Sequence, residues 1–165
     1  MSRAYPVTLP PESALAPGYA DADLADAYAI RLPASASADV DVLARAMLAR
    51  PPGWVAPLMG ARDAIMGLVG VKTARQIERG SRARARDTIG FFPVRERLGN
   101  EIILGEDDRH LDFRSAIILR DDDAGSRELV WSTVVHCRNR LGRIYLAAIT
   151  PFHRVIVPAY LKRVG

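Results

Sequence analysis

Three polar residues at a spacing of two form the sharpest cluster of chemically capable side chains in this sequence: His110, Asp112 and Arg114. Because side chains alternate between the faces of a β-strand, an extended segment places all three on one face. A carboxylate can there orient an imidazole beside a fixed positive charge, which suits a general base next to an anion-binding group. A solvated strand face opposite a core of Leu111 and Phe113 produces the same pattern, so both interpretations stay open.

The other two histidines, His136 and His153, share no metal-ligand spacing such as i and i+4 on one helix, so neither a metal site nor a cofactor is predicted. His153 follows Phe152 in a segment that is apolar around most of its circumference. This context favours a partly buried core histidine over a catalytic one, yet His153 is also the histidine best placed to line a cavity. The candidate catalytic residues are therefore His110, Asp112 and His153.

Asn139 and Arg143 stand where a helix is expected to begin. The Asn139 amide can cap the free N–H groups of that helix, and the Arg143 guanidinium can receive a carboxylate or phosphate at the mouth of a pocket. Ser132 and Thr133 have no adjacent base, and the sequence contains no Gly-rich phosphate loop or nucleophile elbow. Cys137 beside Arg138 suggests some acidity, but a lone cysteine is usually a small apolar side chain.

The chain has 165 residues, which suits one domain able to bury its own core. A single cysteine excludes an internal disulfide and favours a reducing compartment, and residues 1–20 lack the apolar run of an export signal. No stretch approaches ~18 uninterrupted apolar residues, so no membrane span is expected. These features together predict a cytoplasmic protein, and they leave its oligomeric state undetermined.

Hydrophobic periodicity predicts an α+β fold. Helical spacing indicates a helix capped by Ser37 and ending near Ala49, then a second over 54–68 with an apolar stripe that includes Trp54 and Leu68. A third, long helix follows Asn139 and is expected to kink at two prolines. Alternating or β-rich segments predict strands at 24–32, 92–98, 101–104, 110–120 and 128–137. Gly99-Asn100 predicts a two-residue hairpin turn between two of them.

The organisation that follows is an irregular, loosely packed leader at 1–22 and one domain at 23–165. In that domain a curved antiparallel sheet wraps around the long C-terminal helix, and two helices are inserted after the first strand. An Arg-rich segment at 72–86 separates these helices from the following strands. It carries six Lys and Arg residues, and its interpretation is either an arm that contacts phosphates or a solvated connector. The second is favoured because the segment has no aromatic side chain to stack on a base.

Two stretches resemble the signature of a bacterial family of uncharacterised domains, the domain of unknown function family 2867. They are GEDDRHLDFR at 105–114 and NRLGRIY at 139–145, the latter followed by PFHR at 151–154. Trp54 and Arg62-Asp63 extend the resemblance, which covers roughly Asp26 to Arg163. The family is similar to the helix-grip (START-like) superfamily of polyketide cyclases, lipid-transfer domains and pollen allergens. That resemblance implies an apolar ligand held between the sheet and the last helix.

The leading functional hypothesis is a small apolar or amphipathic ligand bound in such a cavity. The expected ligand-binding residues are Phe113, Arg114, Trp131, Thr133, Arg143, Tyr145 and Phe152, with Asp112 and the two arginines at the mouth. The alternatives are an enzyme of the cyclase, dehydratase or isomerase kind with a histidine base, and a nucleic-acid-binding protein that uses residues 72–86. A small-molecule ligand is the favoured partner and nucleic acid is not. A membrane-surface role for the apolar C-terminal helix is a fourth and weaker possibility, because that helix is expected to be the central element of the core.

Overall fold

The computed structural model describes residues 2–69, 73–83 and 87–165. Within them the chain forms an open antiparallel sheet in the order β1-β2-β7-β6-β5-β4-β3. The strands are β1 (Tyr5–Pro6), β2 (Leu24–Arg31), β3 (Thr88–Ile89), β4 (Phe92–Leu98), β5 (Glu101–Asp107), β6 (Leu111–Asp121) and β7 (Arg127–Cys137). The predicted α+β class and the long C-terminal helix are thereby confirmed.

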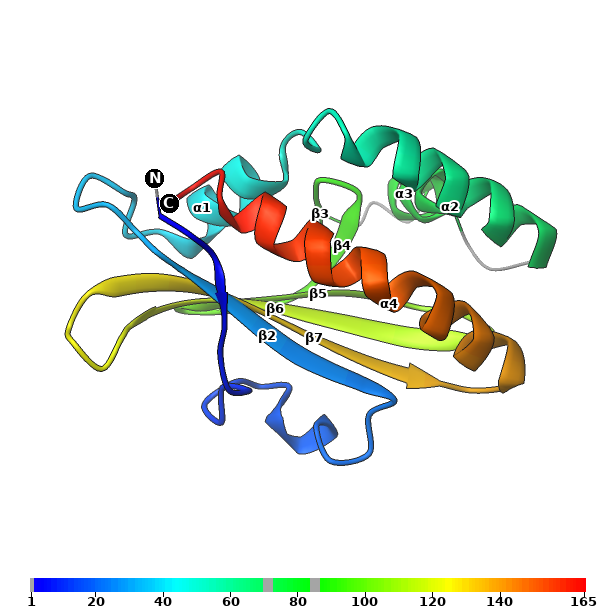
Figure 1. The fold of residues 1–165 in the computed structure, drawn as a ribbon, viewed down its shortest axis with the longest axis horizontal. Helices are drawn as coiled ribbons and strands as arrows, with labels where there is room; N and C mark the ends of the chain where they lie inside the picture. Colours follow the sequence, from blue (N-terminus) through cyan, green and yellow to red (C-terminus); the bar gives the residue numbers. More distant parts are fainter. Residues whose placement is uncertain (1, 70–72, 84–86) are drawn as a thin grey trace.

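All four α-helices lie on one side of the sheet, and the segment that follows β1, residues 7–18, lies on the other (Figure 1). The helices are α1 (Val40–Leu48), α2 (Val55–Val69), α3 (Ala74–Ala83) and α4 (Arg140–Leu161). Three helices, rather than the predicted two, therefore separate β2 from β3. The additional helix, α3, occupies the segment interpreted as a connector. Its only large apolar side chain in the middle is Ile77, which is too little to produce an apolar stripe in the sequence.

Helix capping agrees with the sequence at α4 and differs at α1. The side chain of Asn139 accepts a hydrogen bond from the Gly142 N–H at 3.0 Å, as predicted. At α1 the cap is Asp39, whose carboxylate accepts from the N–H groups two and three residues on, whereas Ser37 Oγ accepts from the Asp39 N–H. Helix α4 is continuous through both Pro151 and Pro158.

The turns that join the longest strands follow their local sequence. Gly99-Asn100 connects β4 to β5 with Gly99 at φ 56°, a conformation that glycine reaches without a steric penalty. The turn between β6 and β7 is held by Asp122, whose carboxylate accepts from the N–H groups of Ala124 and Ser126. The predicted meander of antiparallel strands is confirmed in both places.

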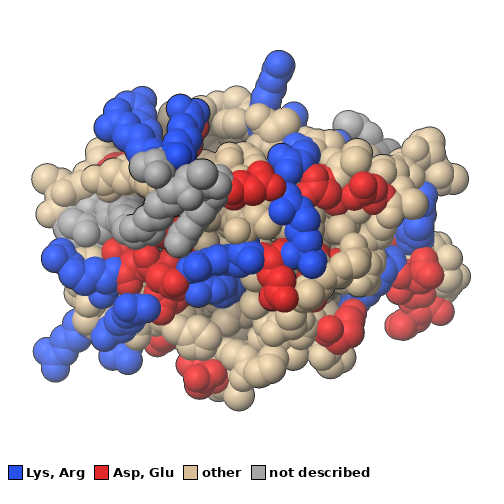
Figure 2. All heavy atoms as spheres, turned by 180° about the vertical axis from the view of Figure 1, so that it is seen from behind, with Lys and Arg blue, Asp and Glu red and all other residues tan. Residues whose placement is uncertain are grey.

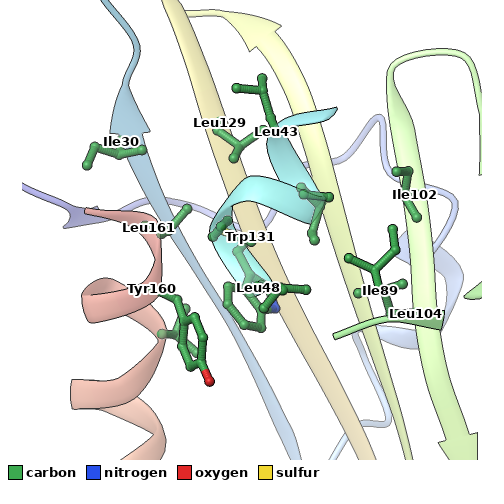
Figure 3. Close-up of a cluster of buried hydrophobic side chains, with 14 of the residues drawn as sticks. Ile30, Leu43, Leu48, Ile89, Ile102, Leu104, Leu129, Trp131, Tyr160 and Leu161 are labelled. Atoms are coloured by element: carbon green, nitrogen blue, oxygen red, sulfur yellow. The ribbon is translucent and has the colours of Figure 1, made fainter. Parts of the chain in front are cut away.

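The main core fills the space between the helices and the sheet (Figure 3). Trp131 of β7 lies at its centre, near Tyr160 of α4 and Leu48 of α1. The opposite face of the sheet carries a second, smaller cluster of buried apolar residues, among them Ala27, Ala116 and Val130. Both faces of the sheet are therefore covered, the first by helices and the second by the leader.

The leader is packed more firmly than its proline-rich composition predicts. Tyr5 pairs with Ala29 in β1 and donates a hydrogen bond from its hydroxyl to Glu128 at 2.6 Å. Ser13 donates to the buried carboxylate of Glu101 at 2.5 Å. Through these contacts, and through its apolar side chains on the outer cluster, the leader adds β1 to the sheet and packs on the outer face of the sheet.

Helix α2 differs from its predicted orientation. Trp54, just before it, and Leu68 near its end are largely exposed, although both belong to the predicted apolar stripe. Val55 is instead fully buried, and Leu58 and Met59 are half-buried. The reason is that α2 packs beside α4 and covers a cavity. Fewer of its apolar side chains therefore contact the sheet.

Candidate ligand-binding cavity

A cavity of about 390 Å³ lies between the sheet and the three helices α2, α3 and α4. Its floor is formed by inward-facing residues of β6 and β7, and its sides by residues of the helices and of the segment before β4. The principal lining residues are Leu58, Arg62, Ile77, Phe92, Phe113, Ser115, Trp131, Thr133, Tyr145, Phe152 and His153. A site of this size and mainly apolar character is typical of small-molecule binding sites.

An aromatic cluster forms one wall of the cavity. The Phe92 ring meets Phe113 edge-on at a centroid distance of 5.8 Å and Trp131 at 6.3 Å. Trp131 in turn contacts Tyr160 at 6.0 Å, and Phe91 stacks on Phe92 at 4.0 Å. Such edge-to-face pairs fix ring orientations, so this wall is a preformed apolar surface.

Two buried polar atoms in this wall have no hydrogen-bond partner among the described residues. They are the indole Nε1 of Trp131 and the hydroxyl Oγ1 of Thr133. Both residues line the cavity, and they are only 4% and 6% exposed. A buried donor left unpaired costs about 1–3 kcal/mol, so these two groups are the polar positions at which a bound molecule gains most.

A histidine–carboxylate pair lies at the same wall. His153 Nε2 of α4 is 3.0 Å from Asp26 Oδ1 of β2, and both side chains are mostly buried. Asp26 is directly opposite Thr133 in the β2–β7 register, which brings the three polar side chains to one region of the wall. With its proton on Nε2, the His153 ring donates to Asp26 and keeps Nδ1 as a proton acceptor.

A second polar group lies where α2 meets α4. Arg62 Nε donates to the Tyr145 hydroxyl at 2.9 Å, and the guanidinium is 5.9 Å from the centre of the same ring. Arg62 also donates to Asp63 at 2.9 Å. Burial raises the pKa of Tyr145, and the nearby Arg62 charge opposes this rise. The Tyr145 hydroxyl accepts from Arg62 and keeps its own proton to donate.

Six of the residues singled out in the sequence meet at the cavity: Phe113, Trp131, Thr133, Tyr145, Phe152 and His153. Their role in binding or catalysis stays a prediction. Sequence reasoning missed Asp26, Arg62, Glu106 and Ser115, of which all but Asp26 line the cavity. Alternation along the strands was the available signal for Glu106 and Ser115, since both point to the same side as Phe113. No local pattern pairs Asp26 with a histidine 127 residues away.

His110 lies outside the cavity, just before β6. Its ring Nδ1 is 3.0 Å from the Asn139 amide nitrogen, and its backbone carbonyl accepts from the Arg138 N–H at 2.9 Å. Because the side chain is buried beneath the start of α4, His110 holds the junction between β6 and that helix. The predicted alignment of His110 with Asp112 and Arg114 is therefore wrong, since His110 precedes the strand.

Asp112 and Arg114 lie on the opposite face of the sheet from the cavity, as do Ala116 and Ile118 of the outer cluster. Asp112 accepts from Arg138 at 2.9 Å, and Arg114 donates to Asp107. The predicted mouth of the cavity is thus corrected: these two residues form ion pairs on the outer face. Alternation identified their common side correctly, but it did not tell which side the helices cover.

The Asp107 carboxylate offers a pH-dependent test of this outer cluster. Burial opposes ionisation, but hydrogen bonds from Arg114 and Arg95 outweigh it and lower the pKa of Asp107 from 3.8 to about 2. A depressed pKa contributes stability above pH ~4 that is lost as the pH falls towards ~2. Asp107→Asn should therefore reduce the unfolding free energy at pH 7 by about 0.5–1 kcal/mol, given its partial exposure. Urea unfolding at pH 7 and at pH 2 checks this prediction. An equal loss of unfolding free energy at the two pH values would contradict it.

Arg143 also lies away from the cavity. Its guanidinium is largely exposed and pairs with Asp23 at 3.4 Å, and Asp23 in turn accepts from the Cys137 N–H at 2.6 Å. The role predicted for Arg143 at the cavity mouth is therefore corrected to a surface ion pair. The geometric reason is its position on the helix, one residue before the exposed Ile144 and two before the inward-facing Tyr145.

The neighbouring Cys137 should be a slow nucleophile. Burial, together with the nearby Asp23 carboxylate, raises the pKa of the Cys137 thiol from 9.0 to about 11. At pH 8 this shift reduces the thiolate fraction about a hundredfold, so alkylation by iodoacetamide should slow by at least that factor. Mass spectrometry of the alkylated protein measures the rate, and the same reaction in urea is the control. Equal alkylation rates for the folded protein and for the protein in urea would contradict the raised pKa of the Cys137 thiol.

Two glycines of the quoted stretches are needed for close backbone contacts. A Cβ on Gly142 would lie 2.2 Å from the carbonyl oxygen of His110, and one on Gly105 would lie 2.4 Å from that of Phe113. Gly142 thus lets the start of α4 rest directly on the segment before β6. The local geometry shows why glycine is required at these two positions.

A family model described as "Protein of unknown function (DUF2867)" matches residues 19–160. The chain belongs to this family. The resemblance inferred from the sequence is thereby confirmed, whereas the placement in the helix-grip superfamily stays a prediction. No curated protein and no solved structure gave a significant match. Membership of DUF2867 identifies relatives of this chain and assigns no activity.

The Arg-rich segment of this DUF2867 domain contributes to the cavity through Ile77, which lines it from α3. Arg82 pairs with Glu78 one turn away at 2.6 Å, and Arg75 and Arg79 are exposed. Lys72, Arg84 and Arg86 lie outside the described residues. On the face shown in Figure 2, acidic and basic side chains are interspersed. Nucleic-acid binding through this segment stays a prediction, and retardation of DNA or RNA at low salt would test it.

Within the part of the chain that the structure describes, no group of three His, Cys, Asp or Glu side chains is arranged to hold a metal ion.

Proposed function

We propose that this chain binds a small, mainly apolar molecule with a hydrogen-bonding head group in the cavity between the sheet and α4. The volume of about 390 Å³ lies within the range usual for small-molecule sites. The aromatic wall offers a rigid apolar surface to such a molecule. The helix-grip placement, which belongs to the same proposal, implies a ligand in this position.

The observation that carries the proposal is the pair of buried, unpartnered polar atoms among the residues that line the cavity, Trp131 Nε1 and Thr133 Oγ1. An indole N–H can only donate a hydrogen bond, so it requires an acceptor from the ligand. A carbonyl, carboxylate or ether oxygen meets this requirement. The ligand is therefore best described as an amphipathic molecule with an oxygen acceptor at one end.

Native mass spectrometry of the purified protein, compared with its denatured mass, tests the proposal first. A non-covalent adduct of a few hundred daltons would support it and would identify the class of ligand. The complementary assay uses the amphipathic dye anilinonaphthalene sulfonate as a probe. A Trp54→Phe background leaves Trp131 as the single tryptophan, so that dye binding in the cavity should change the emission of Trp131.

Neighbouring alanines on α4 provide a matched pair for this assay. Ala148 lines the cavity and Ala147 does not, although both are exposed. Ala148→Phe should weaken dye binding at least fivefold by occupying the cavity, whereas Ala147→Phe should leave it unchanged. Equal effects of the two variants, together with a native mass equal to the denatured mass, would overturn the proposal.

A second candidate function, proton-transfer catalysis of the cyclase, dehydratase or isomerase kind, is favoured by the His153–Asp26 pair at the cavity wall. Of the predicted catalytic residues, only His153 lies there. His153→Ala should abolish turnover of a molecule recovered from the cavity while leaving its binding intact. His136→Ala is the control, because His136 is outside the cavity and its side chain is partly exposed. Turnover that survives His153→Ala would exclude this mechanism.

A further inference from the structure

The outward side of α4 carries a continuous apolar stripe. Ile144, Phe152 and Val155 are 67%, 49% and 56% exposed, which is unusual for large apolar side chains. At helical spacing they share one side with Ala148 and Pro151, which are also exposed. We call residues Ile144, Ala147, Ala148, Pro151, Phe152 and Val155 the α4 stripe. In the view of Figure 1 no other element crosses in front of α4.

Positive charge surrounds the α4 stripe without any acidic residue in the same segment. Residues 139–165 contain five Lys and Arg and no Asp or Glu. Arg140 and Arg143 precede the stripe, Arg154 lies beside it, and Lys162 and Arg163 follow it. Arg143 pairs with Asp23, but among the described residues no ion pair engages the other four. A solvent-exposed apolar stripe with unpaired cations at both ends is typical of a helix that lies on an anionic membrane surface.

Helix α4 is long and apolar enough to cross a membrane by length and composition alone. Its inner side, however, supplies Tyr145, Leu146, Val157, Tyr160 and Leu161 to the interior of the protein. Only the stripe is available to lipid while the fold is intact. The geometry is therefore that of an interfacial helix, with apolar side chains entering the lipid boundary and arginines and lysines reaching the phosphates.

We propose that the α4 stripe docks on the surface of a bilayer that contains anionic phospholipids. Ile144, Ala148 and Phe152 of the stripe also line the cavity, so docking would face the cavity mouth towards the lipid. The face in Figure 2, on which acidic residues are interspersed with basic ones, lacks the charge bias of α4. This docking depends on the stripe and its cations and does not require a ligand in the cavity.

Co-sedimentation with sucrose-loaded vesicles tests the docking. The full chain should bind vesicles of phosphatidylcholine with roughly 30% phosphatidylglycerol, should bind pure phosphatidylcholine at least tenfold less, and should dissociate as salt is raised. The triple variant Ile144→Ser, Phe152→Ser, Val155→Ser should lose at least tenfold in binding. Val42→Ser, which replaces a half-exposed apolar residue of α1, is the matched control and should bind as the parent does.

The charge contribution is tested separately by Arg140→Gln combined with Lys162→Gln, which should weaken binding to anionic vesicles and reduce its salt dependence. Thermal unfolding of each variant verifies that the fold is retained, which is expected because all replaced side chains are exposed. A parent protein that binds neither kind of vesicle, or both equally, would overturn the proposal. So would a dimer in analytical ultracentrifugation that the triple variant dissociates, because a second copy would then cover the stripe.

Discussion

Replacing Gly142 by alanine is expected to destabilise the protein by about 2–3 kcal/mol, although the residue is in a helix where alanine is normally preferred. The new Cβ would lie 2.2 Å from the His110 carbonyl oxygen and 3.0 Å from its carbon. Both neighbours are backbone atoms, so no flexible side chain can move aside. The start of α4 would have to lift away from the segment before β6.

Such a movement would also break hydrogen bonds. The His110 carbonyl accepts from the Arg138 N–H, and the Asn139 side chain accepts from the Gly142 N–H while contacting the His110 ring. Separating the two segments therefore disturbs the cap of α4 as well as its packing. Because α4 forms one wall of the cavity, the same variant should weaken binding of the probe dye.

Urea unfolding compares Gly142→Ala with two controls in α2, Gly60→Ala and Gly67→Ala. Nothing lies within 4 Å of a Cβ at either control position. These controls should therefore raise the unfolding free energy by about 0.5–1 kcal/mol through helix propensity alone. An unchanged or increased stability of Gly142→Ala would show that the close contact with His110 does not restrict this position.

The elements that the sequence predicts well are those whose signal is local. Alternation and β-rich composition identify the five long strands, and the Gly99-Asn100 turn fixes one hairpin. The apolar spacing of α4 continues across both prolines, so the long helix could be recognised in spite of them. The aromatic residues of the cavity follow from the same periodicities, because apolar positions of β6, β7 and α4 must face one another.

The polar part of the site could not be predicted because both faces of the sheet are covered. Alternation places Asp112 and Arg114 together, but it does not distinguish the face under α4 from the face under the leader. Likewise, the sequence indicates that His153 lies on a helix, but it does not indicate which side chain His153 contacts. Asp26 meets it only because β2 pairs with β7 beneath α4, which is a property of the tertiary fold.

Removing residues 2–18 is expected to destabilise the protein by several kcal/mol and to make it prone to aggregation. The leader covers the outer cluster with Tyr5, Val7, Leu9 and Leu15. It also supplies partners to two carboxylates that are only 6% and 3% exposed, those of Glu101 and Glu128. Its contacts span 88 to 123 residues of sequence, so no local pattern could reveal them.

Tyr5→Phe separates the polar and apolar contributions of the leader. It retains the aromatic ring on the outer cluster and removes only the hydrogen bond to Glu128, so a loss of about 1–2 kcal/mol is expected. The truncated chain should lose clearly more, because it also exposes the apolar side chains of the outer face and leaves Glu101 without Ser13. Urea unfolding and light scattering measure both variants. A truncated chain as stable and soluble as the full one would mean that the outer face of the sheet tolerates water, and that the family match at 19–160 already contains the whole folding unit.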